Sequence, residues 1–147
     1  MIIEGLYNLI ISTPAIASLV SNGASPPQFS VHLGSLRKGF TLPAIRLNIA
    51  TTSFIITAQS TADLEYQTIQ FDCIAGGNDP NGYINAKRLK DAVKSLLKDY
   101  AGTLADGTII RASFLKNEID DPLEESKGGY AFRSTLDIQF AYNNPST

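Results

Sequence analysis

Few residues of this chain could do chemistry, and they are isolated from one another. His32 is the single histidine among 147 residues, and Cys73 is the single cysteine. A histidine that acts as a general base needs a partner that orients it, and a zinc ion needs several ligands. His32 stands among apolar residues of a short extended segment, and Cys73 is in phase with the apolar positions of a strand. We therefore expect both side chains to be structural.

Paired carboxylates occur in one segment, residues 118–129. The acidic residues are Glu118, Asp120, Asp121, Glu124 and Glu125. The two acids of a glycosidase need a rigid frame that fixes their separation, and an EF-hand needs spaced oxygen ligands around a mid-loop glycine. This segment instead contains Pro122 and ends at Gly128 and Gly129. These features predict a solvated acidic loop without a catalytic or metal-binding role.

Two further features resemble phosphate-binding elements only superficially. Gly76 and Gly77 precede a predicted helix, but neither the G-x-G-x-x-G pattern nor a Walker lysine is present. A lysine stripe recurs along one side of that helix: Lys87, Lys90, Lys94 and Lys98. Asp91 and Asp99 interrupt the stripe, and the formal net charge of the chain is −2. We expect a solvated helix face and no sequence-specific binding of nucleic acid.

The sequence therefore predicts a protein that is not an enzyme, with no catalytic residue, metal or cofactor. One cysteine cannot form a disulfide within the chain, so an oxidising compartment is not implied. The first residues lack the basic and apolar regions of a signal peptide, and no segment has the ~20 apolar residues of a membrane helix. We expect a soluble protein made in a cytoplasm, without a membrane partner.

The elements that must position these residues are organised around residues 64–100. Apolar residues occupy every second position from 69 to 75, which is typical of a strand with one buried face. Asp79 and Pro80 then favour the start of a helix, as its cap and its first residue. Apolar side chains recur at helical spacing in residues 89–100, opposite the lysine stripe. This pattern predicts a strand followed by an amphipathic helix that packs on the same sheet.

The remaining segments supply further strands and one broken helix. Residues 2–20 have helical periodicity, with a restart at Thr13 and Pro14. The other expected elements are an extended segment at 28–33, a loop at 34–42, a strand from Pro43, a hairpin tip at 51–63, and strands at 108–116 and 130–142. The 108–116 segment places apolar residues on both faces, whereas 130–142 alternates cleanly.

This order predicts a single α+β domain spanning residues 1–147, with a flexible tail at 143–147. We expect an antiparallel sheet of about four or five strands, with an N-terminal helix and one main amphipathic helix packed on one face. The other face is expected to be wet. It would carry Arg46, Thr68, Gln70, Asp72, Arg133 and Asp137.

Several short stretches, taken in order, carry a resemblance to a known family. They are the broken helix from Leu6 to Val20, Leu42-Pro43-Ala44-Ile45 at the entry to a strand, the strand Gln67-Thr68-Ile69-Gln70-Phe71-Asp72, the helix with Asn85-Ala86-Lys87-Arg88-Leu89 that ends near Leu96-Leu97, the acidic segment, and the strand Phe132-Arg133-Ser134-Thr135-Leu136-Asp137-Ile138. Over nearly its full length the chain resembles the tail terminator, or tail-completion, proteins of long-tailed bacteriophages. The resemblance rests on these patterns and not on an invariant signature.

The resemblance implies an α+β fold that assembles into a ring, commonly a hexamer. Such a ring caps the finished tail tube and provides the joining surface for the head-neck proteins. The implied partners are further copies of this chain, the tail tube protein, and a head-completion or neck protein. The implied location is the tail-neck junction of the virion, after assembly in the host cytoplasm.

Two long loops and several charged residues are the candidate interface of such a ring. A lone domain is expected to shorten loops such as 51–63 and 118–129 unless they make contacts, although both are also compatible with ordinary hairpin tips. The interface candidates are Arg46, Asp72, Lys87, Lys94, Lys98, Glu118, Asp120, Asp121, Glu124, Glu125 and Arg133. We expect the acidic loop to be mobile in the isolated protein and to bind the lysine stripe of the next subunit.

Two other classes of protein are compatible with the sequence. One is another phage structural protein, either a head-completion protein or a tail-tube protein, and the latter would polymerise into long cylinders. The other is a small bacterial enzyme or ligand-binding domain. That class would need a concave pocket with convergent polar groups.

Overall fold

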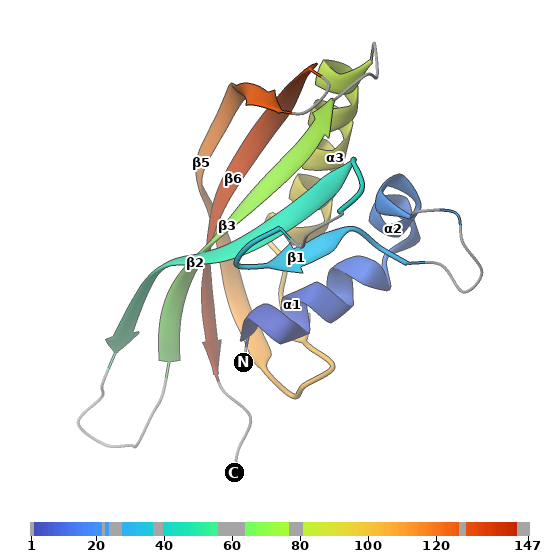
Figure 1. The fold of residues 1–147 in the computed structure, drawn as a ribbon. Coiled ribbons are helices and arrows are strands. Elements are labelled where there is room, and N and C mark those ends of the chain that lie inside the picture. The colour runs from blue at the N-terminus through green and yellow to red at the C-terminus, as the bar shows by residue number, and fades with distance from the viewer. Residues whose placement is uncertain are drawn as a thin grey trace.

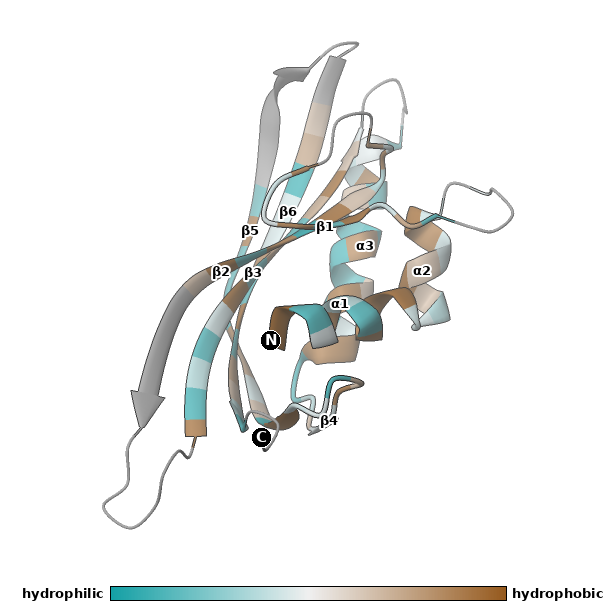
Figure 2. Ribbon diagram, turned by 60° about the horizontal axis from the view of Figure 1, so that its bottom comes forward, coloured by the Kyte–Doolittle hydropathy of each residue, from teal (hydrophilic) through white to brown (hydrophobic). Residues whose placement is uncertain are grey.

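The computed structural model describes residues 2–21, 23, 28–36, 40–55, 64–76, 81–126 and 129–143, with residues 51–55, 121–126 and 129–130 as backbone. Its helices are α1 (Ile2–Ile11), α2 (Pro14–Val20) and α3 (Gly82–Leu97). Its strands are β1 (Val31–Leu33), β2 (Ala44–Ile55), β3 (Leu64–Gly76), β4 (Gly102–Thr103), β5 (Ile109–Ser126) and β6 (Gly129–Asn143). The helices lie on one side of a curled sheet, which leaves its other face uncovered (Figures 1 and 2).

The strands form one six-stranded sheet in the order β1-β2-β3-β6-β5-β4. β1 pairs with β2 in parallel, and every other neighbouring pair is antiparallel. The last strand of the sequence, β6, therefore lies between β3 and β5 in the middle of the sheet. The helix α3 covers β3 and β6 on one face.

The predicted all-antiparallel sheet with an N-terminal helix and one main helix is wrong. The fold is a six-stranded mixed sheet, curled into a half-barrel, with three short helices and more residues in strands than in helices. β1 lies within the extended segment predicted at 28–33, whereas β4 has two residues and is too short to show a periodic pattern in the sequence. The sequence also does not predict that β1 pairs with β2 in parallel, because the direction of the pairing depends on the path of the chain between Leu33 and β2.

The predicted break in the N-terminal helix is confirmed. α2 begins at Pro14 after the N-cap residue Thr13, and the two helices bend by 84°. The Thr13 hydroxyl donates a hydrogen bond to the Leu9 carbonyl at 2.7 Å, so it closes the end of α1 and does not cap α2. Gly5 has a packing role in α1, since a Cβ at this position would lie 2.8 Å from Leu104 Cδ1.

The helix α3 begins later than predicted. Its N-cap residue is Asn81 and its first residue is Gly82, whereas Asp79 and Pro80 lie outside the described residues. A Cβ at Gly82 would lie 2.6 Å from the Cα of Gly76, so the first turn of α3 packs directly on the end of β3. Two glycines allow this close approach of backbones, which accounts for the position of the helix start.

The predicted acidic loop is a strand. β5 continues to Ser126 and pairs with β6 as a long hairpin, through Glu118↔Leu136 and Asp120↔Ser134. The ladder satisfies the backbone groups of a segment whose residue types are poor strand formers, and Pro122 lies at a register shift, where a missing N–H is tolerated. β2 likewise extends to Ile55, so strand replaces part of the predicted tip at 51–63, and residues 56–63 lie outside the described chain.

The core lies between the helices and the sheet. The rings of Phe71 and Phe140 meet edge to face, with their centroids 6.3 Å apart, and both side chains are fully buried. α3 contributes Leu89 and Leu97 to the same core, and Leu96 packs against its margin. The predicted alternation of β6 is confirmed, because the side chains in phase with Phe140 are buried from 134 to 142.

We predict that Phe71→Ala lowers the free energy of unfolding by about 3–5 kcal/mol, because it leaves a cavity against Phe140 in the centre of the core. The matched control is Thr68→Ala, on the uncovered face of the same strand, which should stay within about 0.5 kcal/mol of the wild type. Both values follow from chemical denaturation monitored by circular dichroism. Equal losses in the two variants would mean that the faces of β3 are assigned the wrong way round.

Candidate functional site

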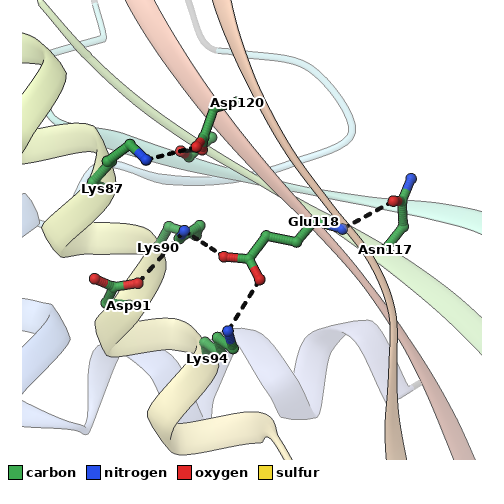
Figure 3. Close-up of polar contacts among 8 residues, drawn as sticks. Lys87, Lys90, Asp91, Lys94, Asn117, Glu118 and Asp120 are labelled. Carbon is green, nitrogen blue, oxygen red and sulfur yellow. Dashed lines mark hydrogen bonds and ion pairs between the residues drawn. The ribbon is translucent and has the colours of Figure 1, made fainter.

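The most conspicuous charged feature is a lysine–acid cluster between α3 and β5 (Figure 3). Lys87 Nζ lies 2.7 Å from Asp120 Oδ2, and Lys94 Nζ lies 3.0 Å from Glu118 Oε2. Between them, the Lys90 ammonium donates to the other oxygen of Glu118 and lies 3.5 Å from Asp91 Oδ1. Two strand carboxylates thus bind three ammonium groups on one side of the helix.

Two β-bulges interrupt β5 before the carboxylates. The register of β5 against β6 shifts at Arg111 and again at Lys116. Each shift adds one residue to β5 and reverses the face of the side chains that follow, so the two shifts together cancel. Glu118 is opposite Leu136, whose side chain is in the core, and it faces α3 on the same side of the sheet as Ile110. The same shifts explain why the sequence of this strand has apolar residues in both phases.

Lys90 is the buried member of the cluster, with a side chain that is 8% exposed. Burial by itself would lower the pKa of the Lys90 ammonium, but the hydrogen bond and the charge of Glu118 outweigh it, and the pKa is raised. Hydrogen bonds from Lys90 and Lys94 lower the pKa of Glu118. Hydrogen bonds from Lys87 and from the Ser134 hydroxyl lower the pKa of Asp120.

The cluster bears on two expectations about the acidic segment. The segment was expected to be a mobile loop in the isolated chain, yet Glu118 and Asp120 lie in a paired strand. It was expected to bind the lysine stripe of the next subunit, which stays a prediction; here Glu118 and Asp120 bind Lys87, Lys90 and Lys94 of their own chain. These three lysines and two acids hold the hairpin on α3 within one molecule.

A second polar network lies on the uncovered face of the sheet. Asp72 was expected there as an exposed residue, but it is fully buried. Its Oδ2 accepts hydrogen bonds from Arg46 Nε and Nη2 at 3.0 and 2.6 Å, and its Oδ1 accepts one from the Thr135 hydroxyl at 2.8 Å. β3 lies between β2 and β6, so Arg46 and Thr135 close over Asp72 from both sides. The network ties three strands together.

The other predicted interface residues are not brought into one site. Lys98 is exposed at the C-terminal end of α3, where its N–H donates to the Lys94 carbonyl. Arg133 lies on β6 between Ile74 and Asp121, on the uncovered face. The side chains of Asp121, Glu124 and Glu125 lie outside the described part of the structure, although their backbone belongs to β5.

A set of exposed apolar side chains lies along the two edges of the sheet and was not predicted from the sequence. Phe114 and Ile119 are exposed on β5, on the uncovered face. Leu33, Phe40 and Ile49 are exposed at the other edge, formed by β1 and β2. Ile49 is in phase with the buried Ile45 and Leu47, so periodicity alone predicted it to be buried. A further pair, Tyr83 and Ile84, is exposed at the start of α3.

A shallow groove of about 500 Å³ lies between α1 and β1, and we call it the α1–β1 groove. Its lining residues are Glu4, Tyr7, Asn8, Val31, Leu33 and Ser35. Glu4 is the single carboxylate among them. Its polar side chains come mostly from one helix and do not converge on a point, as a small-molecule site would require.

His32 and Cys73 are both buried. The His32 Nε2 lies 3.0 Å from the Ser30 hydroxyl, which donates to the Thr41 carbonyl at 2.6 Å, and the ring meets Phe40 edge to face at 6.0 Å. Burial raises the pKa of the Cys73 thiol, so the thiolate that a nucleophile requires is disfavoured.

Within the described ranges, no group of three or more His, Cys, Asp or Glu residues is placed to hold a metal ion. In the same part of the chain no single helix is long and apolar enough to cross a membrane. The bent pair of α1 and α2 reaches that length and composition only when taken together, and its large apolar side chains are mostly buried in the core.

Comparison with known proteins finds a likeness in structure and none in sequence. No protein-family model matches the chain, and no curated protein matches it. One chain of a solved structure described as "Virion of native gene transfer agent (GTA) particle" has a similar fold, with a TM-score of 0.62 at 15% identity. The likeness covers 95% of this chain and 92% of that chain. At this identity it shows a shared fold.

We predict that Glu118→Gln lowers the free energy of unfolding by about 1–3 kcal/mol, because it removes the carboxylate that binds the buried Lys90. The matched control is Asp91→Asn, because Asp91 is an exposed partner of the same ammonium at 3.5 Å. This substitution should change the free energy of unfolding by about 0.5 kcal/mol or less. Urea denaturation at neutral pH measures both. A loss no larger for Glu118→Gln than for the control would show that the cluster does not hold the hairpin.

We also predict a defined loss of stability in acid. The pKa values of Glu118 and Asp120 are lowered in the folded protein from ordinary values of 4.5 and 3.8. Their contribution is therefore fully present above the ordinary values and disappears as the pH falls through the lowered ones. The free energy of unfolding should fall less steeply between pH 5 and pH 2 in Glu118→Gln than in the wild type. Parallel curves for the two proteins would contradict this.

Proposed function

We propose that this chain is a structural protein of a phage-like virion and that it acts as the tail terminator, a ring that caps the completed tail tube. The observation that carries the proposal is the fold likeness to a chain of a gene transfer agent virion, which extends over nearly the whole of both chains. A whole domain is thus compared and not a fragment. The order of elements that resembles the tail terminators supports the finer assignment.

The surfaces of the molecule fit a protein that works by assembly. Both edges of the sheet carry exposed apolar side chains, among them Phe114 on β5 and Leu33 on β1. An open edge with apolar residues promotes aggregation of a lone domain, but it provides a binding surface in a protein that assembles with other chains. The uncovered face carries polar side chains such as Thr68, Gln70 and Asp137 in half-buried positions, which suits a surface that stays in contact with water.

We expect the purified chain to form closed rings, most often of six copies, either alone at high concentration or at the ends of supplied tail tubes. A head-to-tail contact between identical chains closes into a ring when its rotation allows, and otherwise forms a filament. Native mass spectrometry and negative-stain electron microscopy distinguish these states. Tubes that already carry a terminator ring are the control, because their ends are occupied and should bind no further protein.

Two outcomes would contradict the proposal. Long cylinders formed by the chain alone would identify a tail-tube protein instead. A chain that stays monomeric at all concentrations and binds no tube end would exclude a terminator. Removal of the gene from the producing cell gives a second measurement, and we expect separate heads and unjoined tails of abnormal length, with normal particles restored by the wild-type gene.

A further inference from the structure

At the two edges of the sheet, β5 and β1 each have a stretch whose outer side faces no further strand of the described chain, and the two stretches are similar in length. β4 pairs only with Ile109 and Ile110, so the outer side of β5 from Arg111 onward faces no strand of the described chain. On the far side, β1 is the last strand of the described chain and pairs with β2 alone. On its outer side the Val31 N–H donates to the Phe29 carbonyl and the Leu33 carbonyl accepts from Ser35, so the Val31 carbonyl and the Leu33 N–H are the groups that a further strand would bind first. Between its bulges at Arg111 and Lys116, β5 is regular over residues 112–115. This stretch is long enough to match the three residues of β1.

The exposed apolar residues at the two edges lie on corresponding faces. On the uncovered face, Phe114 is 46% exposed on β5, and Phe40, 39% exposed, lies against His32 at the β1 edge. On the helix face, Leu115 is partly buried on β5, and Leu33 is 42% exposed on β1 beside the α1–β1 groove. Because a continued sheet keeps its faces aligned, Phe114 of one copy would meet Phe40 of the next. With Phe114 opposite His32 in an antiparallel ladder, Leu115 would lie opposite Val31 at the α1–β1 groove, with Leu33 as its diagonal neighbour.

The strand directions are compatible with this contact. β1 runs parallel to β2, and three successive antiparallel pairings lead from β2 through β3 and β6 to β5. β5 therefore runs opposite to β1. Copies related by rotation about an axis along the strands keep these directions, so β5 of one copy would lie antiparallel to β1 of the next. Antiparallel pairing is the more stable of the two arrangements.

The charges at the two edges are also opposite. The residues left out of the ladder at the first two register shifts of β5, Arg111 and Lys116, are basic and exposed, and they flank the regular stretch. The α1–β1 groove carries the exposed carboxylate of Glu4. Opposite charges at the ends of a short ladder favour one register over its neighbours.

We propose that residues 112–115 of β5 in one copy add antiparallel to β1 of a second copy, with Phe114 against Phe40 and Leu115 over the α1–β1 groove. The occupant of each open edge is thus another copy of this chain, and the joint runs head to tail. This inference rests on the proposed function, because it names the surface through which the ring closes. A basic residue at a bulge of β5 then binds Glu4 of the next copy.

The first test removes apolar contact from each side of the joint. We expect Phe114→Ser and Leu33→Ser to raise the protein concentration at which half of the chains are in rings by at least ten-fold, in sedimentation velocity and native mass spectrometry. The control is Ile84→Ser, since this side chain is 48% exposed at the start of α3, an element that belongs to neither edge strand. All variants should keep the wild-type thermal melt. Rings that persist equally in every variant would place the joint elsewhere.

The second test exchanges the charges. Glu4→Arg alone, and Arg111→Glu with Lys116→Glu alone, should each weaken ring formation. An equimolar mixture should restore it, because in an alternating ring every joint again has opposite charges. Failure of the mixture to assemble beyond its components would overturn the proposed joint. If the wild type forms rings while these variants behave like the control, the joint is wrong and the tail-terminator function stands; if the wild type never forms rings with tubes supplied, the function itself fails.

Discussion

The rest of the structure depends on the pairing of β3 with β6, because this pair joins segments that are separated in the sequence by α3 and the β5 strand. The register sets Ile69 opposite Ile138 and Phe71 opposite Leu136, which brings the large side chains of both strands to the same face. A slip by one residue would turn this whole set toward water, so burial of the core fixes the register. α3 is then held on the pair by its own apolar stripe, and β5 has a single place left, beside β6.

The position of β5 explains why a charged cluster is buried at the margin of the core. Because of the bulge at Lys116, Leu115 and Glu118 lie on the same face of β5 although they are three residues apart. Leu115 lies toward the core, and Glu118 lies toward Lys90. Taking an ammonium out of water is unfavourable unless a carboxylate and good hydrogen bonds offset it. Glu118 supplies both, and the pair is more valuable as a device that fixes the hairpin on α3 in one register than as a source of net stability.

How much of this could be predicted from the sequence differs from element to element. β3 and β6 were predicted because alternation of apolar and polar residues over many positions is typical of a strand with one buried face. The break before Pro14 was predicted from the residues Thr13 and Pro14 themselves. β4 and the strand character of 118–126 were not, because their existence depends on the ladder of a neighbour and not on their own residues. β1 lies within the extended segment predicted at 28–33, but its parallel pairing with β2 was not predicted. The sheet class failed for the same reason, since a parallel pairing of three residues leaves no pattern.

The charged residues show the same division. Opposite charges on 87–98 and on 118–125 correctly indicated that the two segments attract each other, but charge alone does not distinguish a contact within one chain from a contact between two. The pairing of β5 with β6, which places Glu118 and Asp120 beside α3 of the same chain, decides the question and leaves no signature in the residues of this segment. Asp72 was assigned to a wet face because it is in phase with Thr68 and Gln70, and the side chains of Arg46 and Thr135 that cover it come from strands far away in the sequence.

Because Glu118 and Asp120 are paired within their own chain, the open edges are the better candidates for assembly, and the edges are short. A ladder of three or four residues between two chains is marginal by itself, since even an isolated two-stranded hairpin is barely stable in water. In a closed ring each copy is held by two such joints, so its departure must break both, and the second joint forms at a high effective concentration once the first has formed. Closure also removes the edges altogether, which ends the tendency of exposed strands to pair with wrong partners. Weak joints of this kind would assemble poorly in dilute solution and well on a tail tube that already arranges the copies in a circle. A protein that must wait for a finished tube before it closes would be expected to have joints of that strength.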